Sequence, residues 1–304
     1  MTSRQASRVL DSKRCRRILG ESVPDPEIRS VRYFDSGWDY ELWEVNGELL
    51  FRFPKRPECA ETLRKEARLL TKLAGRLSIA VPRPEYVSEG CEDFPLPFFG
   101  YRTLPGDPLD KVTLDEQTRE LIAQQLGRFL SELHGFPAER AAELGVPSYS
   151  AEGWRAYYRQ LREQVRREVL PLLARSERRA VDAFWRRFLD DERHFRFEPV
   201  LLHGDLSPEH ILVDLERTAI TGVIDFGDAV VGDPAGDFGG FTAAFRQAVL
   251  GAYDLPVDDS LLDRAADYWK ISPFHEVLHG LNIDDQKHID NGLAHVRLEV
   301  VAGA

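Results

Sequence analysis

Two aspartates and a histidine stand at the ends of three short apolar runs: Asp205, His210 and Asp225. The runs cover residues 200–202, 211–213 and 221–224. Short runs rich in branched residues and bounded by polar, Gly or Pro residues predict β-strands. Several oxygen and nitrogen ligands presented at one point suit phosphoryl transfer. In that chemistry one Asp orients the attacking hydroxyl and accepts its proton, while a second acid and a nearby side chain bind the metal ions on the nucleotide phosphates.

The spacing of these residues matches two protein-kinase motifs. Asp205 and His210 form D-x-x-x-x-H, the catalytic-loop pattern with His in place of Asn, and residues 225–227 are the D-F-G triplet. Either motif alone is weak, whereas both in this order between predicted strands are specific. The segments HGDLSPEHIL and IDFGDAVVGDPAGDF resemble the aminoglycoside phosphotransferase family, most closely its 2''-phosphotransferase branch, with the macrolide 2'-phosphotransferases as relatives.

The resemblance implies a role for each of the three residues. Asp205 occupies the position of the catalytic base, Asp225 that of the metal-binding acid, and His210 a position where many members have Asn and the 2'' branch has His. Because Mg²⁺ prefers oxygen ligands and imidazole suits softer metals, we expect His210 to be a weak second ligand and Mn²⁺ to be tolerated. The alternative is a loop histidine that caps a strand end. His203 is interpreted as a structural residue of the loop.

Composition is that of an ordinary globular protein with an acidic balance. The 304 residues are 43% hydrophobic and 30% charged, with a formal net charge of −11. This charge argues against a nucleic-acid partner and suits a polycationic substrate. Three cysteines without paired spacing indicate a reducing compartment, and no stretch has the length of a signal peptide or a membrane span. We expect a cytoplasmic protein, no membrane partner, and a monomer.

The order of predicted elements agrees with the fold that the resemblance implies. A loose helical stripe over residues 4–20 precedes alternating segments at 29–53 with an Asn46-Gly47 hairpin signal, a helix at 58–74 and two further strands. After a hinge at 104–110 the pattern is mainly helical, at 115–134, 151–190, 237–250, 259–271 and 273–298. We therefore expect an α+β, protein-kinase-like two-lobed fold, with a small N-terminal antiparallel-sheet lobe (1–103) and a larger, mainly helical C-terminal lobe (104–304).

A buried ion pair is predicted in the first lobe. Glu66 lies within the apolar stripe of its helix, and a lone buried carboxylate is costly, so we expect Arg52 on strand ELLFRF to pair with it. In kinases a Lys on this strand pairs with a helix Glu and contacts the phosphates, and Arg retains that capacity. Lys55 competes for the phosphate role, but Pro54 and the strand alternation place it just past the strand. A surface pair is the alternative.

The remaining nucleotide contacts are implied by position. The loop that contains Ser36 and Gly37 joins the first two strands, where the family has its nucleotide-covering loop, although a plain turn explains its single glycine equally well. Phe98, Tyr101, Arg102 and Thr103 match the linker that contacts the base. Backbone groups supply most of those contacts, so the sequence leaves ATP or GTP open as the phosphate donor.

Acidic and aromatic residues after the D-F-G triplet are candidates for the acceptor site. Asp228 is expected to face the transfer site, and a ring platform with carboxylates would suit a polycation; the candidates are Asp228, Asp237, Trp269, Glu276, Asp284 and Asp285. For Asp233 and Asp237 we favour a structural interpretation, because the family has an acid here that braces the catalytic loop.

Other functional classes are weaker alternatives. His275-Glu276-Val277-Leu278-His279 matches the H-E-x-x-H helix of zinc peptidases, with His295 or Glu299 as a third ligand. That interpretation leaves the acids at 205 and 225 unexplained. A pseudokinase is disfavoured because base and metal acid are both present, and a protein kinase because no A-P-E segment follows. The sequence therefore predicts an antibiotic kinase that phosphorylates an aminoglycoside hydroxyl, with a macrolide or another small molecule as the alternative acceptor.

Overall fold

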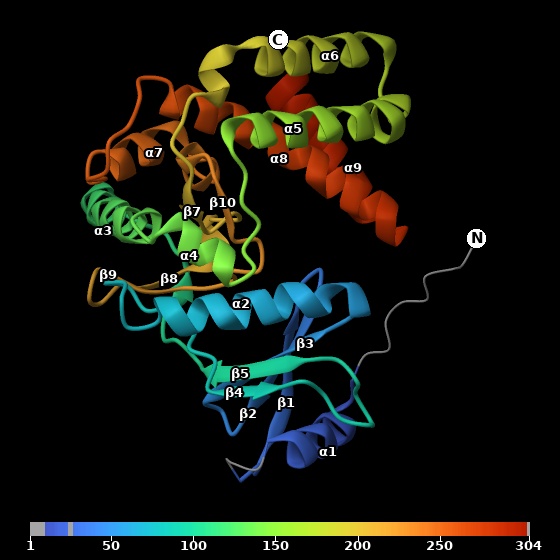
Figure 1. The fold of residues 1–304 in the computed structure, drawn as a ribbon, viewed down its shortest axis with the longest axis vertical. Helices are drawn as coiled ribbons and strands as arrows, with labels where there is room; N and C mark the ends of the chain where they lie inside the picture. The colour runs from blue at the N-terminus through green and yellow to red at the C-terminus, as the bar shows by residue number, and fades with distance from the viewer. Residues whose placement is uncertain (1–9, 24–26, 303–304) are drawn as a thin grey trace. The chain divides into compact units, whose positions relative to one another are not determined.

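The computed structural model describes residues 10–23 and 27–302, shown as a ribbon in Figure 1. The chain forms two compact units that are interleaved in sequence. Unit 1 contains the described residues up to 125 together with 143–146 and 208–229, and unit 2 contains 126–142, 147–207 and the described residues from 230 onward. A division into functional lobes at residues 103 and 104 stays a prediction. Ala6 and Val9, from the predicted N-terminal stripe, lie outside the described residues.

Unit 1 is built on a five-stranded antiparallel sheet with strand order β1-β2-β3-β5-β4. Its strands are β1 (Val31–Ser36), β2 (Tyr40–Val45), β3 (Leu49–Pro54), β4 (Tyr86–Ser88) and β5 (Phe98–Arg102). The predicted hairpin is confirmed between β2 and β3. Asn46 and Gly47 both have positive φ, 59° and 77°, and form the centre of a turn that Glu48 N closes on Val45 O at 3.2 Å. Three residues separate the paired positions Val45 and Leu49.

The two faces of this sheet have different partners. Phe51, Phe53 and Phe98 face a hydrophobic core that includes Ile18 and Leu19 of α1 (Ser12–Ser22). On β3, Arg52 lies between Phe51 and Phe53 and points to the other face. In Figure 1, α2 (Ala60–Leu73) lies on the opposite side of the sheet from α1. Residues of a strand point alternately to the two faces, so the parity of β3 separates a dry core from a charged face.

A second sheet of unit 1 carries residues near the D-F-G triplet. It has the order β6-β8-β9, with β6 at Asp107–Pro108, β8 at Ile211–Asp214 and β9 at Ala219–Val223. The predicted hinge at 104–110 therefore contains a strand. Gly106 has φ 113°, and a Cβ there would lie 2.4 Å from Thr221 Oγ1, so only glycine fits this close approach. The hinge prediction missed the strand because the residues that pair with it lie more than a hundred positions later.

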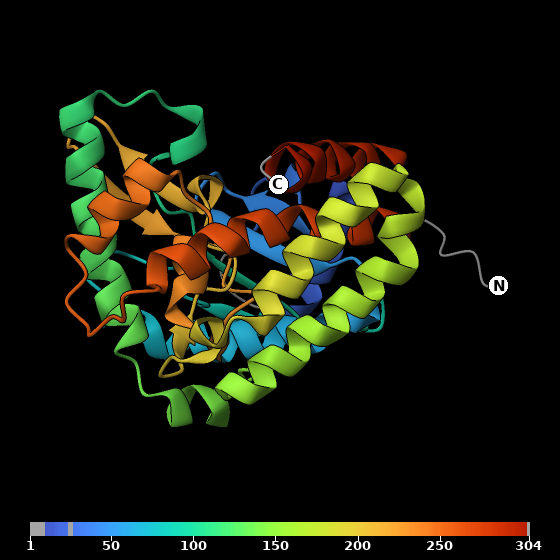
Figure 2. The ribbon, with the colours of Figure 1, turned by 90° about the horizontal axis from the view of Figure 1, so that it is seen from above.

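Unit 2 is mainly helical, with a two-stranded sheet of β7 (Val200–Leu202) and β10 (Val230–Gly232). α3 (Glu116–His134) enters it from unit 1, and α5 and α6 run side by side in Figure 2. The other helices are α4 (Ala138–Glu143), α5 (Ala151–Gln164), α6 (Arg175–Asp190), α7 (Ala243–Leu250), α8 (Leu261–Ile283) and α9 (Gln286–Val296). Short 3₁₀ or π turns complete the chain at 57–59, 109–111, 165–169, 170–172, 192–195, 208–210, 234–238 and 297–301.

The C-terminal helices correct one expected boundary. The sequence predicted a break at residue 272, before Pro273, but α8 continues through Pro273 to Ile283. Asp284 is its C-cap and has a left-handed φ of 58°. Gly280 and Gly292 allow α8 and α9 to approach closely, since a Cβ on Gly292 would lie 2.6 Å from Val277 Cγ2. Proline disfavours a helix interior, but packing against α9 outweighs that local preference here.

Two global features concern the environment of the chain. The described helices include none that is long and apolar enough to span a membrane. All three cysteines lie within the described residues and are free thiols: Cys15 and Cys59 are buried and Cys91 is partly buried.

Candidate active site

The predicted ion pair between β3 and α2 is present and includes a third residue. Arg52 Nη1 donates to Glu66 Oε1 at 2.8 Å, and Arg52 Nη2 donates to Asp225 Oδ1 at 2.9 Å. Arg52 and Glu66 are buried, and the guanidinium carbon lies 4.5 Å from the centre of the Tyr40 ring. One side chain therefore joins the sheet, α2 and the D-F-G segment, all within unit 1.

Asp225 has an unusual backbone conformation. Its φ is 68°, in the left-handed region that residues other than glycine rarely adopt. This turn directs its two carboxylate oxygens to different partners: Oδ1 accepts from Arg52, and Oδ2 lies 4.0 Å from His210 Nε2. The side chain keeps 42% of its surface exposed. A strained, accessible acid of this kind is typical of a functional site rather than of a core.

The electrostatics of the triad follow from its burial. Desolvation raises the pKa of Glu66 to about 7, opposed by Arg52 and assisted by Asp225. Burial alone would lower the pKa of Arg52, but the carboxylates of Asp225 and Glu66 raise it above its ordinary value. Arg52 therefore remains charged, and the ionisation of Glu66 is the step that proton concentration controls near neutral pH.

The donor set around Asp225 fits a hard divalent cation bound mainly by phosphates. Mg²⁺ in kinase sites is usually bound through one or two carboxylates together with nucleotide phosphates and water. Asp225 offers one such carboxylate, and the imidazole of His210 lies beside its second oxygen. Among the described residues no group of three or more His, Cys, Asp or Glu side chains is placed to hold a metal by itself.

The loop after β1 is tied to the residues that follow β3. Lys55 Nζ donates to Gly37 O at 2.5 Å, and Arg56 donates to the carboxylate of Asp39. Gly37 N donates to Tyr40 O at 3.1 Å and closes the turn. Lys55 does lie just past β3, as predicted, where it holds the loop that contains Ser36, while Arg52 is the cation beside Asp225.

The predicted base-contact residues of β5 point their side chains to opposite faces of the sheet. Phe98 is buried on the α1 face, where its ring lies 4.7 Å from that of Phe53, so its side chain points away from Arg52. Phe99 and Tyr101 take the Arg52 face instead, since Arg52 pairs with Phe99 in the register. Strand parity therefore limits Phe98 to a backbone contact with a nucleotide base, and the contacts of this linker stay a prediction. Thr103 is exposed, and its backbone N–H donates to Glu48 O at 2.9 Å.

The loop that carries Asp205, the predicted catalytic loop, follows β7 in unit 2. Asp205 is exposed, and its backbone N–H donates to His203 Nδ1 at 3.3 Å. Asp237 is fully buried and accepts from His203 N at 2.7 Å and from Gly204 N at 2.9 Å. One carboxylate therefore holds the loop through hydrogen bonds from two main-chain N–H groups. Gly240 lies against the same loop, where a Cβ would be 2.1 Å from Leu206 O.

These contacts correct the expectation that Asp237 meets substrate. A carboxylate without exposed surface and with all its partners in the protein cannot bind an acceptor, and its bonds are those of the brace that the family resemblance implies. His134 of α3, which the sequence analysis missed, lies 3.1 Å from Asp237 Oδ2 and holds Tyr253 Oη at 2.8 Å. The hydrogen bond from His134 lowers the pKa of Asp237 in spite of its burial.

Asp233 is likewise structural, as the sequence analysis favoured. Its carboxylate accepts from Arg264 Nε at 2.7 Å and Nη2 at 3.0 Å, and from Tyr268 Oη at 2.7 Å. Tyr268 Oη also accepts from Trp154 Nε1 at 2.9 Å. This buried network joins α5 and α8 to the turn after β10.

The expected acceptor residues differ in how available they are. Asp228, Trp269 and Asp284 are exposed. Asp285 is the N-cap of α9 and accepts from Lys287 N at 2.9 Å, so its carboxylate stabilises a helix end. Glu276 lies 3.6 Å from both His288 Nδ1 and His295 Nδ1.

The H-E-x-x-H segment lies on α8. His275 is exposed, and the ring of His279 packs at 5.4 Å against that of His288. Glu276 is surrounded by histidines of α9 rather than by the two of its own motif. As stated for the described residues, these side chains form no group that could hold a metal.

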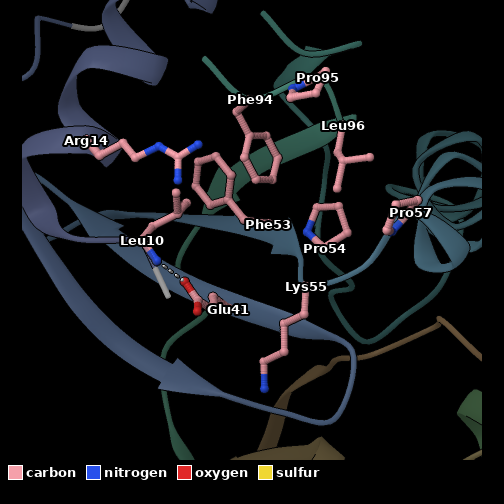
Figure 3. A pocket seen from close by; sticks show the side chains of 10 residues that line it. All are labelled: Leu10, Arg14, Glu41, Phe53, Pro54, Lys55, Pro57, Phe94, Pro95 and Leu96. Atoms are coloured by element: carbon pink, nitrogen blue, oxygen red, sulfur yellow. Dashed lines mark hydrogen bonds between the residues drawn. The ribbon is translucent and has the colours of Figure 1, made fainter. Parts of the chain in front are cut away.

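A pocket of about 280 Å³ lies on the α1 side of unit 1 (Figure 3). The rings of Phe53 and Phe94 line it and lie edge to face, 5.4 Å apart, and the side chain of Lys55 points away from them. Leu10 N donates to Glu41 Oε2 at 3.1 Å at its edge. Because Phe53 and Arg52 point to opposite faces of β3, this pocket is separate from the Arg52–Asp225 site.

Comparisons with known proteins agree with this geometry. A family model described as "Phosphotransferase enzyme family" matches residues 30–274. Viomycin phosphotransferase from Streptomyces vinaceus is 26% identical over 291 residues, which cover 93% of this chain and 98% of that protein.

Two solved structures are similar over most of the chain. One is the GDP and kanamycin complex of APH(2")-IIIa, with a TM-score of 0.87 and 30% identity, covering 95% of this chain and 99% of the other. The macrolide 2'-phosphotransferase MphH from Brachybacterium faecium gives 0.70 and 26%, over 88% and 91%. The expected fold, a small antiparallel-sheet lobe with a larger helical lobe, is therefore confirmed.

Proposed function

The chain belongs to the phosphotransferase enzyme family, and from that premise we propose that it transfers the γ-phosphate of ATP or GTP to a hydroxyl of an aminoglycoside, 2''-type, and so confers resistance. The observation that carries the proposal is the joint contact of Arg52 with Glu66 and Asp225. It places a permanent cation beside the acid of the D-F-G triplet, as transfer from a nucleotide requires. Enzymes of this kind, including aminoglycoside and macrolide phosphotransferases, act as antibiotic kinases.

Each residue has a proposed part in the transfer. Asp205 orients the acceptor hydroxyl and accepts its proton as the bond to phosphorus forms. Arg52, whose fork is shared between Glu66 and Asp225, pairs with the phosphates when a nucleotide is bound. Glu66 keeps Arg52 oriented. A bound Mg²⁺ would be held by Asp225 and His210 and would neutralise phosphate charge; Mn²⁺ is expected to be tolerated.

The loop after β1 and the β5 linker would complete the nucleotide site. Ser36 and Gly37 lie on a loop already held by Lys55, which gives a backbone of defined shape to cover phosphates. Tyr101 shares the Arg52 face of the sheet, and Thr103 follows it at the end of β5. The similar aminoglycoside enzyme was solved with GDP bound, which supports GTP as a phosphate donor to be tested beside ATP.

An aminoglycoside is the preferred acceptor because kanamycin occupies that similar structure and because this chain carries a net charge of −11. Asp228, Trp269, Glu276 and Asp284 are the proposed acceptor contacts. Asp285 contributes less, since its oxygen already caps α9. A macrolide is the second candidate, supported by the similarity to the macrolide enzyme. We propose that the protein acts in the cytoplasm as a monomer. The free thiols support a reducing compartment such as the cytoplasm.

A nucleotide-turnover assay across an antibiotic panel tests the proposal. The panel contains kanamycin, gentamicin, a macrolide and viomycin, each with ATP and with GTP, and products are identified by mass. We expect phosphorylated aminoglycoside with wild-type protein. Asp205→Asn should lower turnover by about 10³-fold while nucleotide affinity stays within about twofold. Retained turnover in Asp205→Asn would remove the base assignment, and no phosphorylated antibiotic with any pair would overturn the function.

The acceptor contacts need a separate measurement. Glu276→Gln combined with Asp284→Asn removes two negative charges and leaves the helix cap at Asp285 intact. If the acidic side chains bind the polycation, the KM for kanamycin rises while the KM for nucleotide does not. An unchanged KM for kanamycin would exclude Glu276 and Asp284 as acceptor contacts. A lower KM for the macrolide alone would favour a macrolide as the acceptor.

A further inference from the structure

The D-F-G segment is held by α2 at more than the Arg52 bridge. Glu66 Oε1 accepts from Phe226 N at 3.2 Å, and the neighbouring Lys65 donates from Nζ to Gly227 O at 2.6 Å and to Ala229 O at 3.1 Å. Lys65 and Glu66, which are consecutive in α2, thus contact three main-chain groups within residues 226–229. All of these residues belong to unit 1.

Lys65 is an unusual residue for such a place. It is buried, and burial lowers the pKa of its ammonium group, with the charge of Asp228 as the largest opposing effect. A buried cation needs partners to offset its desolvation. An apolar side chain of similar length would avoid the desolvation cost of the ammonium group, but it would leave the carbonyls of Gly227 and Ala229 without this donor. These two effects on the stability of the fold oppose each other.

The contacts of Lys65 instead restrict the conformation of Asp225. Asp225 has a left-handed φ of 68°, which persists only if the surrounding structure holds the backbone on both sides of it. Ile224 N donates to His210 O at 2.9 Å on one side, and the carbonyls of Gly227 and Ala229 are fixed by Lys65 on the other. Release of those carbonyls would let the turn relax and the carboxylate lose its direction.

We propose that Lys65 is a positioning residue that holds the Asp225 carboxylate in the orientation in which it binds the metal ion of the metal–nucleotide complex. This role rests on the proposed function and adds to it a residue that touches neither nucleotide nor acceptor. Lys65 acts through the main chain, whereas Arg52 acts on the carboxylate directly. Because the two anchors differ, loss of Lys65 should reduce metal binding without removing the cation that faces the phosphates.

The test is the metal dependence of nucleotide binding. Affinity for non-hydrolysable ATP and GTP analogues is measured by calorimetry, once with Mg²⁺ and once with EDTA, for wild type and Lys65→Met. We expect the strengthening by Mg²⁺ to fall at least about tenfold in Lys65→Met, equivalent to about 1.4 kcal/mol, while the affinity in EDTA stays within about twofold. Lys72→Met, an exposed position of the same helix, is the matched control and should behave as wild type.

A purely structural role would give a different result. Lys65→Met would then lower its melting temperature, or weaken binding equally with Mg²⁺ and with EDTA, and either result with unchanged metal dependence overturns the proposal. Should Lys65→Met fail to fold, Lys65→Gln, whose side chain is shorter and uncharged, is measured in the same way and must show a reduced response to Mg²⁺. A wild-type protein whose nucleotide affinity does not respond to Mg²⁺ would overturn the proposed function first, and this role with it.

Discussion

Two segments with proposed roles, the metal-acid segment of unit 1 and the catalytic loop of unit 2, are held by different means. Residues 225–229 are held by charged side chains, Arg52, Lys65 and Glu66, which reach them from β3 and α2. The loop at His203 and Gly204 is held by the single buried carboxylate of Asp237 through two main-chain N–H groups. Asp225 keeps much of its surface exposed, whereas Asp237 keeps none.

This difference indicates how far each segment can adjust. Side-chain cations can exchange one anionic partner for another, so Arg52 can move from Asp225 towards a phosphate without any change of fold. Main-chain N–H groups that face a buried acid have no such alternative, because an unpaired buried donor costs about 1–3 kcal/mol. The first arrangement suits an exchange of ligands, and the second suits a base that must stay in one place.

The largest effect on this difference between the two segments is expected from a change at the buried acid, Asp237. Asp237→Asn places an amide N–H₂ where an oxygen now accepts, so one main-chain donor is left unpaired. We expect a loss of about 3 kcal/mol in the free energy of unfolding, measured with urea, together with a large fall in turnover. Since the folded-state pKa of Asp237 is lowered, its stabilisation is present above about pH 4 and lost as the pH falls below that, so the difference from wild type should shrink in acid. An equal difference at pH 3 and pH 7 would contradict this assignment.

The second prediction concerns the packing of the catalytic loop. A Cβ at Gly240 would lie 2.1 Å from Leu206 O, so Gly240→Ala must displace the main chain next to Asp205. We expect kcat to fall about 10- to 100-fold with little change in the KM for nucleotide, because small displacements of a catalytic group are costly. Gly236→Ala is the control, since its Cβ would meet only a Leu202 methyl at 3.4 Å. Equal kcat values for the two variants would show that the loop adjusts as freely as the metal-acid segment.

The third and smallest effect concerns pH and the charged triad. The pKa of Glu66 is raised to about 7 in the folded protein, so the folded state binds more protons than the unfolded state between about pH 4.5 and 7. Wild-type stability should therefore decrease as the pH rises through that window, by an amount on the order of 2 kcal/mol relative to Glu66→Gln. Urea unfolding at pH 5 and pH 7.5 measures the difference. Glu61→Gln, exposed on the same helix, should follow wild type, and parallel profiles for all three proteins would contradict the shifted pKa.

Several parts of the fold follow from local pattern. Asn46-Gly47 predicted the β2–β3 hairpin because few other residues take positive φ twice in succession. Glu66 predicted its partner Arg52 because a buried acid in an apolar stripe requires a cation. Local pattern failed at Pro273, where α8 continues because of packing against α9.

The contacts that hold the active-site segments were beyond sequence reasoning for a physical reason. Lys65 and the carbonyls it binds are separated by more than 160 positions, and Arg52 is 173 positions from Asp225. No periodicity or motif links residues at such separation. His134 is a further case, since nothing in its own helix pattern marks it as a partner of Asp237.

By itself, the sequence determined the phosphotransferase family and the candidate residues for the chemistry, because the motifs around Asp205 and Asp225 are short and their spacing is local. Only the tertiary structure decided how those residues are held: Arg52 shared between two acids, Lys65 bound to the main chain, and Asp237 withdrawn from the substrate into a buried brace. Such roles depend on the burial and partners that long-range folding creates, and these set the cost of each charge.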